Sequence, residues 1–289
     1  MALDIKIPSR KEAIEDFKNN GGKIAVVFPI HYPRALLRAH GILPVETWGP
    51  PKTDLSLGDA HLQSYTCSVI RHGLSYLLGG GFDVADMILV SHCCDTLQGL
   101  GSILLDFVPL KQPTYTFYIP RDRREIDIEY FARELYALSE RLSRTSGKVP
   151  DEATLIAAIE VEERAAWNAK VLFAVRRELP ASNREFYTLL RSREYLPAET
   201  FNGLASQVLA DKRCQPLDEI PIVLSGIVPE PAEMFDALTR MKAIIVEDDC
   251  LSTGRRIYKQ QRRHDPWSRM SETIVLGPPD ATLGASFEL

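Results

Sequence analysis

The cysteines are the residues of this chain whose chemistry is most specific. Five occur in 289 residues, at Cys67, Cys93, Cys94, Cys214 and Cys250. An odd number of cysteines in a mid-sized chain whose amino terminus does not resemble a signal peptide argues against a disulfide framework. Thiolates are soft ligands that select iron–sulfur clusters, zinc or copper(I). The thiols are therefore candidate metal ligands, and the alternative is that they are small buried apolar side chains.

The expected elements favour some of these thiols over others. Cys67 precedes an expected helix over 68–78, whose unpaired N–H groups and dipole would stabilise a thiolate or an anionic cluster. Cys93 and Cys94 follow one expected strand and Cys250 follows another. Ligands of open α/β folds bind outside the carboxyl ends of the strands, so three thiols are able to converge on one crevice. Adjacent residues point differently, and at most one of Cys93 and Cys94 is expected to be a ligand.

Other motifs add little to this picture. The six histidines form no close ligand pair such as HxH or HExxH, and His92 is kept as a candidate because it precedes Cys93. Asp95 is placed to accept a backbone hydrogen bond at the start of the next helix. The chain has no GxGxxG, Walker or GxSxG sequence. Cys214 lies in a polar stretch and is assigned no role.

Strands and helices alternate along most of the chain. Short apolar and β-branched runs predict strands at 23–28, 42–45, 87–90, 114–119, 220–224 and 243–246. Apolar residues spaced by three and four predict one helix that includes Ile128 to Leu142, and a second is expected from Asp151 to about Leu179. A further helix is expected at 231–241.

This alternation on both sides of a helical segment predicts an α/β fold with two Rossmann-like parallel-sheet lobes. The expected domains are an N-terminal α/β lobe over 1–120 with Cys67 and Cys94, a helical segment over 121–215, and a partial C-terminal α/β lobe over 216–289. Because the last lobe holds only one strand–helix–strand unit, we expect it to be truncated.

Composition excludes several classes of protein. With 45% hydrophobic residues, 25% charged residues and a net charge of -5, the chain is typical of a soluble globular protein. Arg121, Arg123 and Arg124 alternate with acidic residues, so no nucleic-acid footprint is expected. No stretch approaches the roughly 18–20 apolar residues of a membrane helix. A cytoplasmic protein that binds neither nucleic acid nor membrane is predicted.

The sequence resembles the subunits of benzoyl-CoA reductase and of the related (R)-2-hydroxyacyl-CoA dehydratases, above all the smaller, C-type subunit of the reductase. The first matching stretch is similar to the family opening P-x-x-x-P-x-E-x-x-x-A-x-G-x-x-P-V. The stretches that carry the resemblance, in chain order, are FPIHYPRALLRAHGILPVETWG at 28–49, GDAHLQSYTCSVIRHGL at 58–74, FDVADMILVSHCCDTLQGL at 82–100, and a block between 126 and 250 with IDIEYFARELYAL, REFYTLLRSREYLP, IPIVLSG and VEDDC.

The resemblance implies a cofactor and its ligands. Cys67 and Cys94 match the cysteines that ligate a single 4Fe–4S cluster, and Cys93 stands as the alternative to Cys94. Cys250 occupies a position that is a cysteine in some relatives only, and the family's third ligand lies beyond the end of this chain. One departure concerns an acid/base group, because Arg34-Ala35 follows Pro33 where many relatives carry Glu.

The resemblance also implies a function. Side chains cannot supply the electron that activates an acyl thioester, so a low-potential cluster must carry it. The chain is expected to be the iron–sulfur subunit of an acyl-CoA radical enzyme, of the benzoyl-CoA reductase type. Its partners would be a larger paralogous subunit, an ATP-hydrolysing iron–sulfur activator and a CoA-thioester substrate. The alternatives are a subunit of an (R)-2-hydroxyacyl-CoA dehydratase, or a non-catalytic scaffold subunit that has lost its cluster.

Overall fold

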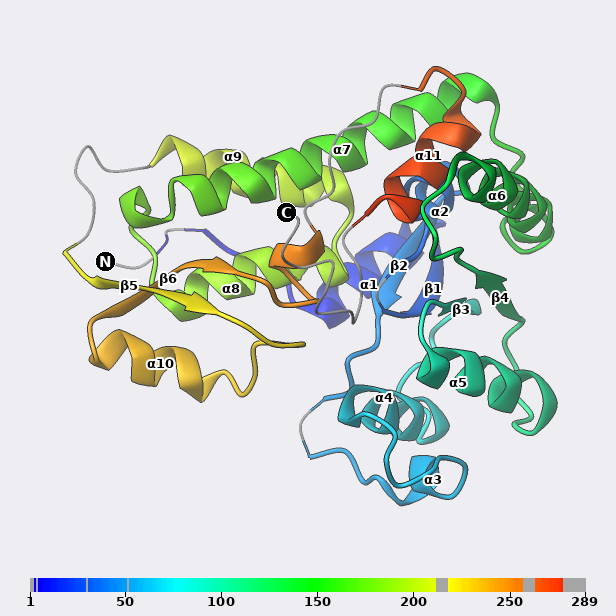
Figure 1. The fold of residues 1–289 in the computed structure, drawn as a ribbon, viewed down its shortest axis with the longest axis horizontal. Helices are drawn as coiled ribbons and strands as arrows, with labels where there is room; N and C mark the ends of the chain where they lie inside the picture. Colours follow the sequence, from blue (N-terminus) through cyan, green and yellow to red (C-terminus); the bar gives the residue numbers. More distant parts are fainter. Residues whose placement is uncertain are drawn as a thin grey trace. The chain divides into compact units, whose positions relative to one another are not determined.

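The computed structural model describes residues 3, 5–29, 31–50, 52–211, 218–256 and 263–277 (Figure 1). Cys214 and the Pro/Gly-rich tail lie outside the described residues. The helices are α1 (Arg10–Asn19), α2 (Arg34–Ala39), α3 (Ser56–Asp59), α4 (Ser68–Leu78), α5 (Asp95–Asp106), α6 (Glu125–Ser146), α7 (Glu152–Ala174), α8 (Asn183–Arg191), α9 (Ala198–Ala210), α10 (Glu233–Arg240) and α11 (Pro266–Val275). The strands are β1 (Lys23–Phe28), β2 (Ile42–Glu46), β3 (Met87–His92), β4 (Thr114–Tyr118), β5 (Ile220–Leu224) and β6 (Ala243–Asp248).

The chain forms two compact units. The four-stranded unit comprises Ile14–Ile159 and Gln261–Leu276, and the two-stranded unit comprises Met1–Ala13, Glu160–Gln260 and Gly277–Leu289. Every strand pair in the described residues is parallel, which confirms the predicted α/β class with parallel-sheet lobes. The predicted division at residues 120 and 215 stays a prediction. The compact units divide within α7, since Leu155 belongs to one hydrophobic core and Leu172 to the other.

The larger sheet has the strand order β2-β1-β3-β4. Its register pairs Lys23 with Ile42, Ala25 with Met87 and Ile88 with Thr114. The two inner strands, β1 and β3, are buried almost throughout, which is why their sequences are continuous apolar runs rather than alternating patterns. All four strands therefore end at the same edge of the sheet.

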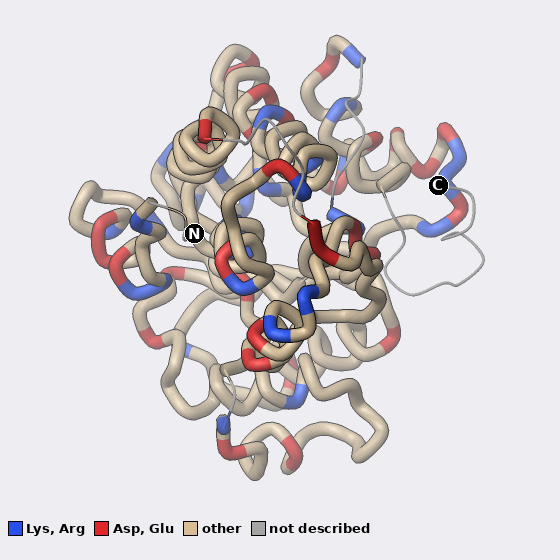
Figure 2. Tube along the Cα trace, turned by 90° about the vertical axis from the view of Figure 1, so that its left-hand side faces the viewer, with Lys and Arg blue, Asp and Glu red and all other residues tan. Residues whose placement is uncertain are grey.

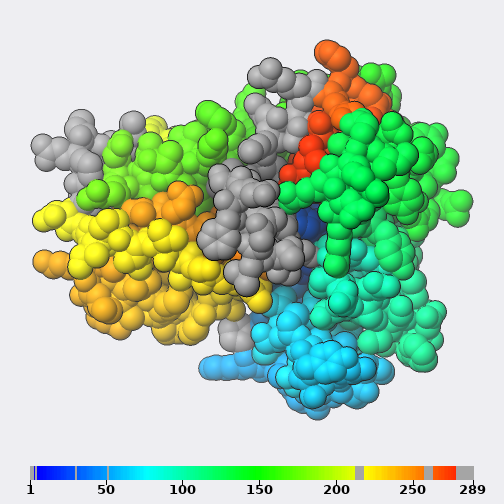
Figure 3. Space-filling view, in the orientation of Figure 1, coloured from blue at the N-terminus to red at the C-terminus, as the bar shows by residue number. Residues whose placement is uncertain are grey.

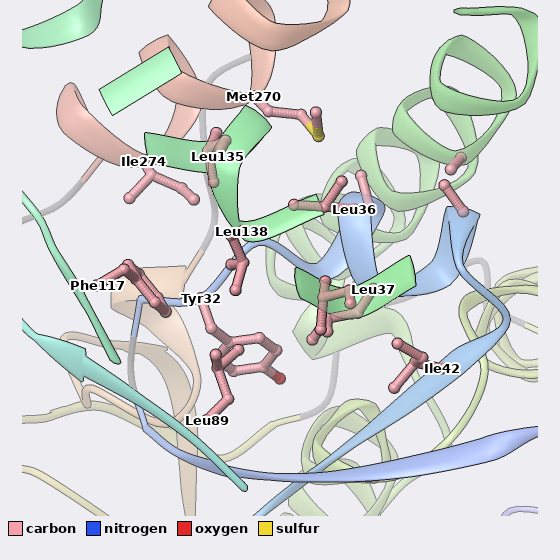
Figure 4. Close-up of a cluster of buried hydrophobic side chains, with 14 of the residues drawn as sticks. Tyr32, Leu36, Leu37, Ile42, Leu89, Phe117, Leu135, Leu138, Met270 and Ile274 are labelled. Carbon is pink, nitrogen blue, oxygen red and sulfur yellow. The ribbon is translucent and has the colours of Figure 1, made fainter. Parts of the chain in front are cut away.

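Helices cover both faces of this sheet. One face, which includes Val27 and Leu89, packs against α2, α6 and α11 in a core that Figure 4 shows around Leu36, Leu138 and Ile274. On the other face, Phe28 contacts α4 at Gly73. Helices α4 and α5 lie on this second side in Figure 1, and each begins near the carboxyl ends of the strands.

A buried histidine joins α2 to α6 within the first core. His40 is fully buried, with Nε2 at 2.8 Å from the Ser139 hydroxyl and Nδ1 at 3.1 Å from the carbonyl oxygen of Lys148. Because a carbonyl only accepts, Nδ1 carries the proton and Nε2 accepts from Ser139. Burial lowers the pKa of His40 below its ordinary 6.5.

In the two-stranded unit, β5 and β6 form a parallel pair and α10 connects them along the chain. The pair packs on α8, α9 and the later part of α7. Buried Asn183 satisfies the outer edge of β6, where its amide donates to the Ala243 carbonyl at 2.8 Å and its oxygen accepts from the Ile245 amide at 3.0 Å. Most of β5 faces solvent, with Val223 70% exposed. The strand that leads to Cys250 is therefore the buried one of the pair.

Several element ends differ from the prediction. Strand β3 continues to His92, two residues further than expected, because its carboxyl end is still paired with β4 at Tyr118. Helix α7 ends at Ala174, and a 3-10 turn over Arg176–Glu178 replaces its predicted last turn. Helix α10 is shorter than predicted at both ends.

Within the described ranges, no helix combines the length and the apolar character needed to cross a membrane. Acidic and basic residues are interleaved along the described trace rather than separated into zones (Figure 2). Charge therefore acts locally in this chain, between individual neighbouring residues.

The buried histidine gives a testable pH dependence. In the unfolded chain His40 takes up a proton near pH 6.5, whereas in the folded protein its pKa is lower. The contribution of His40 to the free energy of unfolding is therefore fully present well above pH 6.5 and is lost as the pH falls below 6.5. The loss is about 1.4 kcal/mol per pH unit until the folded pKa is reached. The variant His40→Gln should lose part of this slope in urea unfolding measured from pH 7.5 to 5. The variant His61→Gln, at an exposed position, should keep it. An unchanged slope in His40→Gln would contradict the assignment.

Candidate functional site

Cys67 is the N-cap residue of α4. Its backbone is extended, with φ −58° and ψ 146°, and its carbonyl oxygen accepts from the amides of Ile70 and Arg71 at 3.2 Å each. The residue is exposed, on the α3–α4 segment that lies at the surface in Figure 3. Neighbouring protein atoms displace water and raise the pKa of the Cys67 thiol, while the backbone amide of Ile70 acts in the opposite direction. Amides at the helix end therefore face this sulfur.

Cys94 is the N-cap residue of α5 and, unlike Cys67, makes a side-chain cap hydrogen bond. Its backbone is extended, with φ −144° and ψ 166°, and its sulfur accepts a hydrogen bond from the Leu97 amide at 3.5 Å. The expectation that Asp95 makes this cap is wrong. Asp95 is the first helical residue, its side chain is exposed, and it lies 3.8 Å from Arg121. The thiol itself occupies the anion position at the helix end.

The two thiols lie at the N-termini of helices that contact each other. Helices α4 and α5 pack against one another, and the pKa of Cys67 is raised mainly by burial, with a smaller contribution from the charge of Cys94. Neither is joined to the other in a disulfide. The structure thus places the predicted pair at one edge of one sheet, at the start of two helices. That the pair ligates a cluster stays a prediction.

Cys93 lies in a different environment from Cys94. Its thiol is buried, with an exposed fraction of 4%, and accepts from the Ser91 hydroxyl at 3.6 Å. Its carbonyl oxygen accepts from Arg121 at 3.0 Å. Cys93 thus contacts Ser91 of strand β3 and Arg121, whereas Cys94 accepts from the Leu97 amide of α5. The choice of Cys94 over Cys93 as the partner of Cys67 stays a prediction.

His92 is buried between β3 and α5. Its ring stacks edge-on against Tyr118 with centroids 4.2 Å apart, and burial lowers its pKa. Neither ring nitrogen has a hydrogen-bond partner among the described residues. A methyl group at Gly101 would come within 2.3 Å of Nε2, so α5 packs directly on the imidazole. His92 thus sets the spacing between the sheet and the helix that Cys94 caps.

Cys250 belongs to the two-stranded unit, on the loop after β6. It is 1% exposed, and burial together with the charges of Asp248 and Asp249 raises its pKa to about 12. Asp248 holds this loop, since it accepts from the Tyr187 hydroxyl at 2.5 Å and from the Gly254 amide at 2.8 Å. Thiolate formation is costly there, and the role of Cys250 as a further ligand, like the convergence of three thiols, stays a prediction.

The pair supplies part of a metal site. Across the residues that the structure describes, no group of three or more His, Cys, Asp or Glu side chains is arranged to hold a metal ion. Two thiolates with amide donors suit a soft, positively charged centre, and clusters of iron and sulfur take three or four protein ligands as a rule. Cys67 and Cys94 therefore fit two of the ligand positions of such a centre.

One charged residue at the carboxyl edge of the sheet, Glu46, is not among the site residues predicted from the sequence. Glu46, the last residue of β2, is fully buried and binds Tyr32, Arg34 and Trp48. Its only signal in the sequence is an acidic residue directly after an apolar strand and two positions before Trp48.

The fold and these side chains define an open, parallel α/β protein with paired helix-capping cysteines at the carboxyl edge of its sheet. The chain belongs to the family described as 2-hydroxyglutaryl-CoA dehydratase, D-component, which matches residues 29–280. This confirms the resemblance inferred from the four sequence stretches.

Characterised relatives are similar along most of this chain. The beta subunit of lactoyl-CoA dehydratase from Anaerotignum propionicum is 27% identical over 256 residues, which are 86% of this chain and 67% of the relative. The C-type subunit of benzoyl-CoA reductase from Thauera aromatica is 26% identical over 259 residues, with the same coverage. The beta subunit of (R)-2-hydroxyglutaryl-CoA dehydratase from Acidaminococcus fermentans is 23% identical over 255 residues, again covering 86% of this chain and 67% of the relative. Each of these proteins is one subunit of an enzyme.

The contact between α5 and His92 gives a test with a built-in control. Gly101→Ala forces the imidazole or the helix to move and should destabilise the protein by about 1–3 kcal/mol in denaturant unfolding. Gly99→Ala, two residues earlier in the same helix, meets nothing within 4 Å and should stabilise it by up to about 1 kcal/mol through helix propensity. Equal effects of the two substitutions would show that α5 does not rest on His92.

Proposed function

We propose that this chain is the iron–sulfur subunit of an ATP-activator-dependent enzyme that acts on acyl-CoA thioesters, and that Cys67 and Cys94 are two ligands of its 4Fe–4S cluster. The observation that carries the proposal is that Cys67 and Cys94 are the N-cap residues of two helices that contact each other, α4 and α5, and that both helices begin at the carboxyl edge of one sheet. Membership of a family whose characterised relatives are subunits of CoA-thioester enzymes supports it.

The residues of this chain provide a holding site for an electron-poor centre. When bound, the cluster supplies an electron of low potential to an acyl thioester. The amides of Leu97 and Ile70 offset part of the negative charge of the two thiolates. Since the pKa of Cys67 is raised without a metal, binding of the centre has to release the thiol proton, and affinity should rise with pH.

The remaining ligands have to come from outside the described residues or from a partner, because the described part of the chain adds no third group to the pair. The relatives are the beta or C-type subunits of their enzymes, so we propose a larger subunit of the same family as partner. An ATP-hydrolysing iron–sulfur activator would deliver the electron.

Removal of both thiols is expected to abolish cluster uptake. The full chain is reconstituted anaerobically with iron and sulfide, and iron content and the EPR spectrum of the reduced protein are measured. Cys67→Ala/Cys94→Ala should bind no cluster, because two anchoring thiolates are lost. Cys93→Ala, which removes the neighbouring buried thiol, is the matched control and should bind as wild type does. A double variant that retains wild-type iron would rule out these ligands, and a wild-type chain that takes up none even when it is reconstituted together with its larger subunit would favour the scaffold alternative.

The benzoyl-CoA reductase type is the specific activity that we propose, and the second candidate is an (R)-2-hydroxyacyl-CoA dehydratase, which is favoured by the names of two of the three relatives above. The assay combines this chain with its larger subunit, an activator and ATP, and follows the CoA esters by mass spectrometry. A reductase adds two hydrogens to benzoyl-CoA, whereas a dehydratase removes water from an (R)-2-hydroxyacyl-CoA. Omission of ATP is the control and should stop either reaction. Turnover of the hydroxyacyl ester alone would contradict the reductase assignment.

A further inference from the structure

A fully buried carboxylate lies at the carboxyl end of β2. The Glu46 side chain has an exposed fraction of 0%, and its Oε1 accepts from the Tyr32 hydroxyl at 2.5 Å and from Arg34 at 3.1 Å. Its Oε2 accepts from the Trp48 indole N–H at 2.9 Å. A buried carboxylate is stable only where charge and hydrogen bonds replace its water, and these three donors do so.

The donors come from the two segments that leave neighbouring strands. Tyr32 and Arg34 lie on the chain after β1, and Trp48 lies directly after β2. The Arg34 guanidinium also donates to the Tyr32 hydroxyl and lies over its ring, 5.2 Å from the centroid. Glu46 therefore fastens the first residues beyond β2 to the segment beyond β1. The position of residues 47–49 relative to the sheet is thereby fixed.

Those residues form the surface on which α4 rests. Gly49 has φ +70°, and a methyl group there would lie 2.2 Å from Cβ of His72 and 2.6 Å from its carbonyl carbon. Gly73 is less tightly enclosed, since a methyl group there would lie 3.2 Å from the Thr47 hydroxyl and 3.1 Å from the ring of Phe28. Backbone therefore meets backbone between residues 47–49 and the second turn of α4.

Helix α4 begins at Cys67, five residues before His72. An α-helix rises about 1.5 Å per residue and behaves as a rigid rod over this length. A sideways shift at His72 therefore moves the Cys67 sulfur by a comparable amount. Cys94 is set separately, by the packing of α5 on His92. The separation of the two sulfurs thus depends on two supports, one beneath each helix, and on the contact between α4 and α5.

We propose that Glu46 is a positioning residue that sets the distance between the sulfurs of Cys67 and Cys94 through residues 47–49 and α4. The use of this distance for a cluster rests on the proposed function. The distance itself is a property of the chain in the absence of any metal, so the two claims can fail separately.

The test measures the distance by chemical bridging. Dibromobimane, which fluoresces strongly only after it has alkylated two nearby thiols, is applied to the reduced, metal-free full chain, and the bridged peptides are identified by mass spectrometry. The wild type should bridge Cys67 to Cys94. Glu46→Gln keeps the shape of the side chain but removes its charge, and Gly49→Ala pushes directly on α4. Each should slow the bridging step roughly tenfold, since a displacement of about 1 Å has effects of this size or larger on reactions between positioned groups.

The control is a second buried carboxylate in the other unit. Glu194 is 2% exposed, with ion pairs to Arg191 at 2.7 Å and Arg10 at 3.4 Å, so Glu194→Gln carries a comparable cost in stability. It should leave the bridging rate unchanged even where its melting temperature falls as far as that of Glu46→Gln. Trp48→Phe removes one donor while keeping an aromatic side chain, and serves if Glu46→Gln does not fold.

The outcomes separate the two claims. Bridging at the wild-type rate in Gly49→Ala and in Glu46→Gln (or Trp48→Phe in its place) would overturn the positioning role, whatever their stability. Slow bridging in both, in a chain whose wild type takes up no iron on reconstitution, would support the positioning role and count against the proposed function alone. Iron uptake by the wild type, together with unchanged bridging in the variants, would support the proposed function and count against the positioning role alone.

Discussion

The direction in which helices run on a parallel sheet governs the chemistry of this molecule. Each crossover helix returns the chain to the start of the next strand, so its N-terminus lies at the edge where the previous strand ended. Helices α4 and α5 both begin at that edge, and each has a cysteine as its first capping residue. Unpaired amides and the positive ends of two dipoles are thereby gathered around two sulfur atoms.

Charge balance decides what this arrangement is able to hold. Burial raises the pKa of Cys67, and the charge of Cys94 adds to this shift because two neighbouring thiolates repel each other. The helix amides relieve this repulsion in part, and a cationic centre between the sulfurs relieves it further. Cys250 shows the opposite case. Its neighbours Asp248 and Asp249 add negative charge, and no comparable pair of helix ends is described around it.

The sequence was sufficient for features that depend on local pattern. Continuous apolar runs located β1 and β3 because inner strands of a parallel sheet are buried on both faces. The positions of Cys67 before an expected helix and of Cys94 after an expected strand predicted that both lie at the start of a helix, and both are N-cap residues. Element ends were less certain, because polar residues such as His92 remain paired in β3 when the neighbouring strand continues.

Contacts between residues that are far apart in the sequence could not be predicted from local patterns. Whether Asp95 or Cys94 caps α5 is decided by which residue has an extended backbone, and both side chains are able to accept a hydrogen bond. Glu46 and its three partners belong to two segments whose proximity exists only once β1 and β2 have paired. Likewise, Gly49 and Gly101 look like ordinary loop and helix glycines until His72 and His92 are placed against them.

The Glu46 network also decides whether this carboxylate is able to act as an acid or base. By the resemblance described above, Arg34-Ala35 stands where many relatives carry Glu, and Ala35 lies on α2 with its side chain buried in the first core. The nearest described carboxylate at the strand end is Glu46, yet it has no exposed surface and each of its oxygens is engaged by Tyr32, Arg34 or Trp48. A carboxylate so enclosed cannot exchange protons with a substrate, because uncovering it would leave the charge of Arg34 without this buried counterpart. The acidic group at this edge therefore acts as a structural anchor.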